Sequence, residues 1–339
     1  MPHQEIGRPL LLSGDTFTPP ARTPWGGHRI RALKRLPPGP IVGEAWELSV
    51  EPSFVSRAAD GRPLTACFAD APEVWLGEEA KRGSTALLVK LLDAHQPLSV
   101  QIHPHDDDPA LGPAESGKPE AWYIVDAEPG AELALGLAPG TDRAAVERAL
   151  DGRADLRASL RFVSVAPGDV FVIEPGLPHS IGAGILLVEP QRVVPGRRGV
   201  TYRYWDFDRR YDADGQPDPN GAPRELHRER ALAVTDWDRA SAPALIDHVR
   251  HRAGAADRRG PAHAERVLES TLYIERLAGV GALTLDDRPC VRSITVLDGE
   301  VTIDGLRLTR GATAALPAGL RSARVELEAA HAIVCGLGG

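Results

Sequence analysis

Leu98-Ser99-Val100-Gln101-Ile102-His103-Pro104 is the stretch of this sequence that says most about the fold. Every second residue is apolar, and the residues between them are Ser99, Gln101 and His103. This alternation with a period of two predicts a half-buried β-strand. A hydroxyl, an amide and an imidazole in succession are unusual on a strand that faces solvent. We therefore expect the polar face of this strand to line a site inside a small barrel.

Further strands are predicted on both sides of this stretch, whereas helical periodicity is rare. Thr141 is a suitable N-cap for a helix closed by Gly152, and later leucines extend the helical spacing over 141–162. Asp298-Gly299 and Asp304-Gly305 stand between alternating apolar runs, which predicts β-hairpin turns at both places. We predict a mainly β protein with strands in the segments 43–49, 86–92, 98–103, 121–125, 168–173 and 184–189.

Composition and charge exclude several classes of protein. The formal net charge of −8 argues against nucleic acid or an anionic membrane as the main partner. The sequence has no apolar run long enough to cross a bilayer, and Met-Pro-His-Gln-Glu at its start lacks the layout of a signal peptide. Cys67, Cys290 and Cys335 are scattered without CxxC spacing, which indicates buried thiols in a reducing compartment. We expect a cytoplasmic protein, and no protein partner is predicted.

Gln101, His103, Glu120 and His179 form the candidate metal site. Two imidazoles, a carboxylate and an amide oxygen are a mixed nitrogen and oxygen set that suits zinc and is tolerable for iron, manganese or cobalt. Each residue alone has a simpler explanation, because a buried glutamine usually bonds to backbone and a lone histidine is more often structural. Taken together on a predicted barrel, the four residues favour a metal-binding cupin.

The segments around these residues resemble type I phosphomannose isomerases (mannose-6-phosphate isomerases) of the bacterial short form, in the cupin superfamily. The resemblance runs from about residue 20 to 235 and is most specific over 90–123. It is carried by Trp25-Gly26-Gly27, Gly43–Ser49, Lys90–Ala94, Leu98–Pro104, Gly117–Tyr123, Gly176-Leu177-Pro178-His179, Thr201-Tyr202-Arg203 and Arg224-Glu225-Leu226-His227.

The resemblance implies a fold of two cupin-type barrels (double-stranded β-helix, jelly-roll) with a small helical insertion and linker. Residues 1–140 and 164–210 would form the metal-binding barrel, and 141–163 with 211–262 the helical and linker segments. Residues 263–339 would form a degenerate second barrel without a metal site. A weak internal repeat agrees with this, because Gly168–Ile181 aligns with Gly311–Ala323 and places Ser322 where the first copy has His179.

The resemblance also assigns roles to individual residues. Gln101, His103, Glu120 and His179 would be the ligands of one Zn²⁺ per chain. Lys118 and Arg203 would be catalytic, and substrate would be bound by Ser99, Lys90 and Glu44.

The sequence departs from the family between Glu189 and Arg203. The family usually has a short Gln-x-Ser-Asp segment there, whereas this chain has the longer basic segment Arg192–Gly199 without Ser-Asp. Its three arginines suit an anionic ligand held by guanidinium forks. A solvated basic loop explains them equally well.

The activity expected from this resemblance is interconversion of mannose 6-phosphate and fructose 6-phosphate through an enediolate. Lys118 is the expected acid/base group, with a pKa lowered by zinc and neighbouring basic groups. Lys90 and Ser99 would position the phosphate, and Arg203 would stabilise oxyanion charge or bind phosphate. The alternatives are an isomerase for a different phosphosugar, an iron-dependent cupin oxygenase, and a non-enzymatic sugar-phosphate-binding cupin.

Overall fold

The strand β3 (Leu87–Ala94) shows how the layers of this molecule are built. All eight of its residues are buried, because it is covered on both faces. Leu87, Val89 and Leu91 belong to one apolar core, and Leu92 and Ala94 belong to another. A strand that is buried on both faces needs no alternation of polar and apolar residues, which explains why apolar residues of β3 point to both faces.

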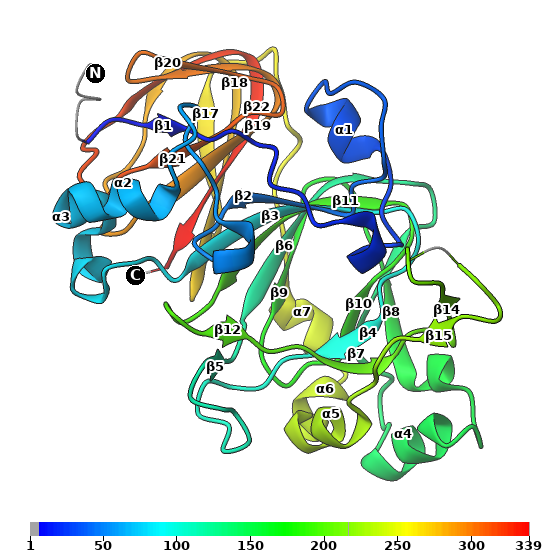
Figure 1. Cartoon of the computed structure of the whole chain (residues 1–339). Helices are drawn as coiled ribbons and strands as arrows, with labels where there is room; N and C mark the ends of the chain where they lie inside the picture. Colours follow the sequence, from blue (N-terminus) through cyan, green and yellow to red (C-terminus); the bar gives the residue numbers. More distant parts are fainter. Residues whose placement is uncertain (1–6, 216, 339) are drawn as a thin grey trace.

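The computed structural model describes residues 7–215 and 217–338. Two of its sheets face each other around the core that contains Leu92 and Ala94, which we call the first core (Figure 1). The six-stranded sheet has the order β16-β9-β6-β11-β3-β2, and the five-stranded sheet has the order β13-β4-β10-β7-β8. The strands of the six-stranded sheet are β2 (Glu44–Leu48), β3, β6 (Glu120–Ala127), β9 (Asp169–Ile173), β11 (Ile185–Arg192) and β16 (Arg250–Arg252). Those of the five-stranded sheet are β4 (Val100–Ile102), β7 (Glu132–Leu137), β8 (Leu160–Ser164), β10 (His179–Ile181) and β13 (Tyr202–Trp205).

The C-terminal part forms a seven-stranded sheet that packs on the other face of the six-stranded sheet (Figure 1). Between these two sheets lies the second core, which contains Val89 and Val188 from the six-stranded sheet and Ile274 and Ile333 from the C-terminal sheet. A third core lies within the C-terminal part. Its strands are β1 (Leu10–Leu11), β17 (His263–Glu269), β18 (Leu272–Thr284), β19 (Arg292–Ile303), β20 (Leu306–Thr309), β21 (Thr313–Leu316) and β22 (Arg324–Leu337).

Helices are short and lie outside the sheets. The α-helices are α1 (Arg29–Leu33), α2 (Leu64–Asp70), α3 (Pro72–Leu76), α4 (Arg143–Leu150), α5 (Arg228–Val234), α6 (Trp237–Ala240) and α7 (Leu245–Val249). Two-residue pairs of strands lie beside the sheets, formed by β5 (Glu115–Ser116) with β12 (Arg198–Gly199) and by β14 (Arg210–Tyr211) with β15 (Ala222–Pro223). No helix in the described ranges is both long and apolar enough to span a membrane. The first five residues, on which the expectation about a signal peptide depends, lie outside the described residues.

The mainly β fold is confirmed, at 40% strand and 17% helix, but several local predictions are wrong. The helix expected over 141–162 ends at Leu150, and Leu160–Ser164 is a strand that completes the five-stranded sheet beside β7. Asp304-Gly305 makes the predicted turn between β19 and β20, whereas Asp298-Gly299 lies within β19 at an irregularity of the ladder.

Two short strands do not follow the expected division of the chain. Leu10–Leu11 pairs with β21 of the C-terminal sheet, although residues 1–140 are expected in the first barrel. Arg250–Arg252 pairs with β9, although 211–262 is expected to be helix and linker. Both strands cover a sheet edge whose backbone groups would otherwise be exposed. The remaining domain boundaries stay a prediction.

A polar contact crosses the interface between the six-stranded and C-terminal sheets. The hydroxyl of Tyr123 lies 3.0 Å from Nε2 of His331. Burial, followed by the charges of Arg276 and Arg258, lowers the pKa of His331 to about 4. The imidazole is therefore neutral in the folded protein at pH 7, and it can accept the hydroxyl hydrogen of Tyr123.

We expect stability to fall on mild acidification because of His331. In the unfolded chain His331 has a pKa of about 6.5. Its contribution to the free energy of unfolding is therefore complete above that pH and is lost as the pH falls toward 4. Between pH 7 and 5 the free energy of unfolding should decrease by roughly 2 kcal/mol from this group. Denaturant unfolding of the wild type and His331→Gln at both pH values measures it. An equally large decrease in the variant would contradict the assignment.

Candidate functional site

Three strands bring the candidate ligands together. His103 directly follows β4, and His179 begins β10, the next strand of the five-stranded sheet. Glu120 begins β6 in the facing sheet. A turn positions His179: Gly176 has φ +84°, which a residue without Cβ adopts readily, and its NH donates to the carbonyl of His103.

The three side chains converge on one point. Nε2 of His103 lies 3.2 Å from Oε1 of Glu120, and Nε2 of His179 lies 4.0 Å from Oε2 of the same carboxylate. One donor atom from each residue lies within 4.8 Å of the others. All three side chains are buried, with exposed fractions of 1%, 2% and 2% for His103, Glu120 and His179.

The hydrogen bonds of the two imidazoles suit metal binding. Nδ1 of His103 lies 2.9 Å from the carbonyl of Val200, and Nδ1 of His179 lies 2.8 Å from the carbonyl of Leu177. A carbonyl accepts only, so each Nδ1 carries the hydrogen and each Nε2 presents a lone pair, the usual arrangement of a metal-bound histidine. Nε2 of His103 is buried and its approach to Glu120 is not aligned as a hydrogen bond. That orphaned atom fits a bound cation.

Electrostatics hold these groups in the protonation states that a metal needs. Burial lowers the pKa of His103, and it lowers the pKa of His179 to about 3. Burial alone would raise the pKa of Glu120, but Lys118 and the two histidines outweigh it and hold the pKa well below its usual range. Two neutral imidazoles and one carboxylate are a borderline donor set that suits zinc.

Gln101, the fourth expected ligand, lies on the strand next to His179. It stands opposite His179 in the ladder between β4 and β10, and it lines the same pocket as Glu120 and His179. The backbone therefore puts its amide one strand away from the His179 imidazole. Its role as a ligand stays a prediction.

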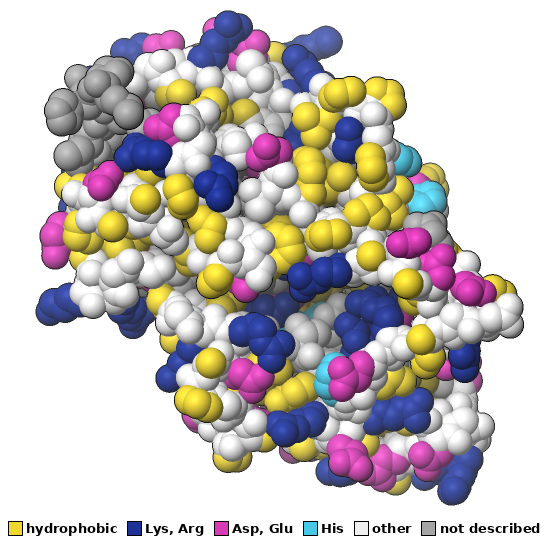
Figure 2. Space-filling model, in the orientation of Figure 1, with side chains coloured by type: hydrophobic (Ala, Val, Ile, Leu, Met, Phe, Trp, Pro, Cys, Tyr) yellow, Lys and Arg dark blue, Asp and Glu magenta, His cyan; other side chains and the backbone are white. Residues whose placement is uncertain are grey.

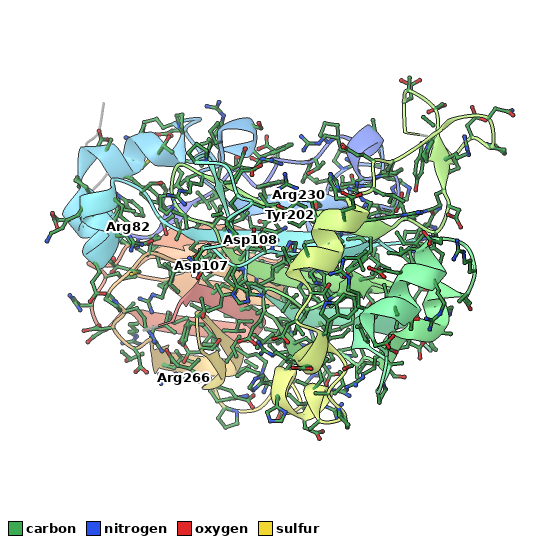
Figure 3. All side chains as sticks on the ribbon, turned by 90° about the horizontal axis from the view of Figure 1, so that it is seen from below. Arg82, Asp107, Asp108, Tyr202, Arg230 and Arg266 are labelled. Atoms are coloured by element: carbon green, nitrogen blue, oxygen red, sulfur yellow. The ribbon has the colours of Figure 1, made fainter. Side chains whose placement is uncertain are left out.

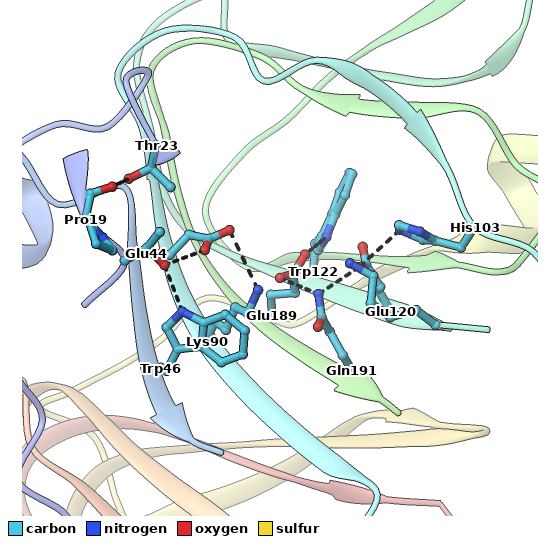
Figure 4. A network of polar contacts seen from close by, with 12 residues as sticks. Pro19, Thr23, Glu44, Trp46, Lys90, His103, Glu120, Trp122, Glu189 and Gln191 are labelled. Atoms are coloured by element: carbon cyan, nitrogen blue, oxygen red, sulfur yellow. Dashed lines mark hydrogen bonds and ion pairs between the residues drawn. The ribbon is translucent and has the colours of Figure 1, made fainter. Parts of the chain in front are cut away.

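Polar groups extend from this trio along the pocket (Figure 4). Nε2 of Gln191 donates to both Glu120 and Glu189, each at 2.7 Å, and the indole NH of Trp122 donates to Glu189 at 2.9 Å. Nζ of Lys118 lies 2.9 Å from Glu120. The whole pocket is lined by Glu44, Lys90, Leu92, Leu98, Gln101, Lys118, Glu120, Trp122, His179, Ser180, Ile181, Glu189 and Gln191.

The structure adds Glu189 as a functional candidate, which sequence reasoning used only as a landmark. Burial and the nearby charge of Glu120 raise its pKa to about 8, so this carboxyl can hold or release a proton near neutral pH. The available signal was a carboxylate directly after the apolar run Ile185–Val188. A buried carboxylate on an otherwise apolar strand needs a polar partner.

The pKa of Lys118 differs from the expectation. Burial lowers it, but the carboxylates of Glu120 and Glu189 outweigh burial and raise the pKa above its ordinary value. The sequence analysis predicted a lowered pKa because it placed Lys118 beside a zinc ion and basic groups. The immediate neighbours are carboxylates instead.

The expected substrate-binding residues fall into two groups. Lys90 and Glu44 lie together: Nζ of Lys90 is 3.7 Å from the Glu44 carboxylate and 3.9 Å from the ring centre of Trp46 (Figure 4). Ser99 instead accepts a hydrogen bond of 3.1 Å from Nε of Arg203. Lys90 and Glu44 line the pocket. Ser99 lies directly before β4, and Arg203 lies on β13, which pairs with β4.

The arginines of the basic segment are already paired. Arg192 bonds the carboxylate of Asp106, Arg198 bonds that of Glu115, and Arg197 donates to the Glu115 carbonyl. These contacts fix the loop that precedes Gly117. This structural role explains the three arginines better than direct binding of an anion does. Seen from below, Arg230 and Tyr202 lie next to the same loop, near Asp107 and Asp108 (Figure 3), and Arg230 donates to the carbonyl of Ala110.

Figure 2 shows a hollow between the upper and lower halves of the molecule, with Lys and Arg side chains around it. The β fold places a buried His-Glu-His trio between two of its sheets, and the donor atoms of this trio could hold a metal ion.

Known proteins resemble this chain in sequence and in structure. "Probable mannose-6-phosphate isomerase GmuF" of Bacillus subtilis is 35% identical over 216 residues, which cover 62% of this chain and 64% of the relative. The matched stretch therefore spans somewhat less than two thirds of that relative. No family model matches the chain.

The solved mannose 6-phosphate isomerase from Bacillus subtilis superposes with a TM-score of 0.73 at 23% identity, over 97% of this chain and 99% of that one. A mannose 6-phosphate isomerase bound with zinc and yttrium gives a TM-score of 0.67 at 14% identity, over 96% and 98% of the two chains. The chain thus has the fold of phosphomannose isomerases, and the resemblance seen in the sequence is confirmed.

Proposed function

We propose that this chain is a zinc-dependent aldose–ketose isomerase that interconverts mannose 6-phosphate and fructose 6-phosphate. The observation that carries the proposal is the convergence of His103, Glu120 and His179, beside Lys118, in a chain that resembles mannose-6-phosphate isomerases. The fold and the donor set support the metal, and the name of the relatives supports the phosphosugar.

The reaction moves one proton between neighbouring carbons. A base removes the proton from C2 of the aldose and an enediolate forms; the proton is returned to C1, while the C2 hydroxyl loses its proton and the C1 oxygen gains one, which gives the ketose. A bound zinc ion would supply Lewis acidity toward the oxygens on which negative charge develops. His103, Glu120 and His179 would hold it, with Gln101 as the expected fourth ligand.

Two groups of this chain could move the proton. Lys118 has an ammonium group at the pocket, and Glu189 has a carboxyl group whose pKa of about 8 lies near neutral pH. General acid–base groups work best when their pKa lies near the operating pH. Gln191 bonds Glu189 and Glu120, so it positions the carboxyl group relative to the metal site.

A coupled assay that follows fructose 6-phosphate production from mannose 6-phosphate tests the proposal. Activity should disappear when a chelator removes the metal and return when zinc is restored, because the enediolate charge would otherwise lack its Lewis acid. A panel of hexose and pentose phosphates separates this reaction from isomerisation of another phosphosugar. A metal-loaded protein that turns over none of them, yet binds them, would be a sugar-phosphate-binding cupin, and the proposal would fail.

A further inference from the structure

The basic segment Arg192–Gly199, where this chain departs from the family, is bonded to the backbone on both sides of Lys118. The first NH of the segment donates to the carbonyl of Pro119 at 3.0 Å. The NH of Val200, directly after the segment, donates to the carbonyl of Ser116 at 3.0 Å. The backbone around Lys118 is therefore held by a part of the chain that is distant in sequence.

Gly199 lies against the methylene chain of Lys118. A β-carbon at position 199 would stand 2.9 Å from Cδ and 3.1 Å from Cγ of Lys118, and 3.2 Å from Cγ2 of Val193. Non-bonded carbon atoms are ordinarily about 3.5–4.0 Å apart, so this atom has no room while the lysine keeps its place. Gly199 does not have a positive φ. Space, and not backbone conformation, therefore requires a glycine here.

The course of the methylene chain decides where the ammonium of Lys118 lies. The side chain is only 14% exposed, and its Nζ lies 2.9 Å from Oε1 of Glu120. Both residues line the pocket. A displacement of Cγ and Cδ is passed on to Nζ because these atoms belong to one bonded chain. A catalytic group must be held within about 0.5 Å of its working geometry by the residues packed around it.

The same part of the chain also reaches the metal site. The carbonyl of Val200 accepts the hydrogen of Nδ1 of His103 at 2.9 Å. The side chains of Arg192 and Arg198 bond Asp106 and Glu115. The arginines thus fix the basic segment to the loop in front of Lys118, and the glycine at the end of the segment faces the lysine.

We propose that Gly199 is a positioning residue for Lys118, and that the basic segment of this chain holds the methylene chain of the lysine beside Glu120. Its meaning for catalysis rests on the proposed function and on the role of Lys118 in it. Gly199 is not among the residues that line the pocket. It therefore acts on the reaction only through the side chain that it contacts.

Gly199→Ala tests the inference in the metal-loaded protein. We expect kcat for mannose 6-phosphate to fall about 10- to 100-fold, because a displacement near 1 Å can cost that much, while the metal content stays unchanged. In the Lys118→Ala background the same substitution should leave kcat unchanged, since no Cγ or Cδ is left for the new methyl group to meet. Gly112→Ala is the matched control. Its β-carbon would meet its nearest neighbour at 3.5 Å, an ordinary contact, and Gly112 has no positive φ either.

A measurement that needs no turnover follows the lysine itself. The chain has only four lysines, Lys34, Lys81, Lys90 and Lys118. Protein labelled with ¹³C at lysine Cε therefore gives few NMR signals, and Lys118→Ala identifies the signal of Lys118 by its absence. We expect this signal to shift in Gly199→Ala and to keep its wild-type position in Gly112→Ala.

An unmoved Lys118 signal or an unchanged kcat in folded Gly199→Ala overturns the inference, as does an equal loss of kcat in the Lys118→Ala background. If Gly199→Ala does not fold, the double variant with Lys118→Ala decides. Recovery of its melting temperature supports the contact, and failure to recover contradicts it. The NMR experiment decides the position of Lys118 even if the wild type fails to isomerise mannose 6-phosphate, so the two proposals fail separately.

Discussion

Replacing His179 with alanine should leave the purified protein with well below one metal ion per chain and lower kcat/KM for mannose 6-phosphate at least about 10³-fold. Nε2 of His179 presents its lone pair toward Glu120, because Nδ1 is held by the Leu177 carbonyl. Removing this imidazole takes one nitrogen from the donor set. The enediolate charge would then form without the Lewis acid on which the proposed reaction depends.

Metal analysis by mass spectrometry and the coupled assay measure these two effects on the same preparations. His179→Gln keeps the volume of the side chain, so it separates loss of the donor from loss of packing against Trp122, whose ring lies 5.5 Å from that of His179. His248→Ala is the control, because this histidine is exposed and contacts the Ala244 carbonyl. A His179 variant that kept a full complement of metal and near-normal turnover would remove the trio from the mechanism.

The residues of the trio could be found from the sequence because local patterns fix their positions. Alternation over 98–103 places Gln101 and His103 on one face of a strand, and a proline–glycine turn places His179 at the start of another. Glu120 follows the Lys118-Pro119 pair and opens β6. The resemblance to a known family then joined three segments that lie far apart in the chain.

Other parts of the structure depend on contacts between distant segments, which local patterns do not contain. Leu160–Ser164 has helical spacing, yet it becomes strand β8 because β7 offers it a partner. Leu10–Leu11 joins the C-terminal sheet more than 300 residues along the chain. The surroundings of Asp206 are another example, since Arg209 and Arg224 both lie beside its carboxylate only when the segment between them folds back through β14 and β15.

Replacing Lys118 with methionine should lower kcat about 10²- to 10⁴-fold, the usual contribution of a general acid–base group, while the metal content stays at the wild-type level. Its Nζ contacts Glu120 at 2.9 Å but belongs to a cationic side chain, which does not bind a cation. Methionine keeps most of the length of the side chain and removes only the ammonium. The same assay and metal analysis measure the two quantities.

The pH dependence of the variant distinguishes a proton-transfer role from a structural one. Glu120 and Glu189 raise the pKa of Lys118 in the protein without an ion, and a divalent cation bound at Glu120 would offset that effect because it adds positive charge next to the ammonium. If Lys118 moves the proton, one limb of the kcat–pH profile of the wild type reports the titration of Lys118, and this limb should vanish in Lys118→Met. Lys81→Met, at an exposed position of the 77–82 turn, should retain the whole profile. Near-normal turnover of Lys118→Met would leave Glu189 as the group that carries the proton.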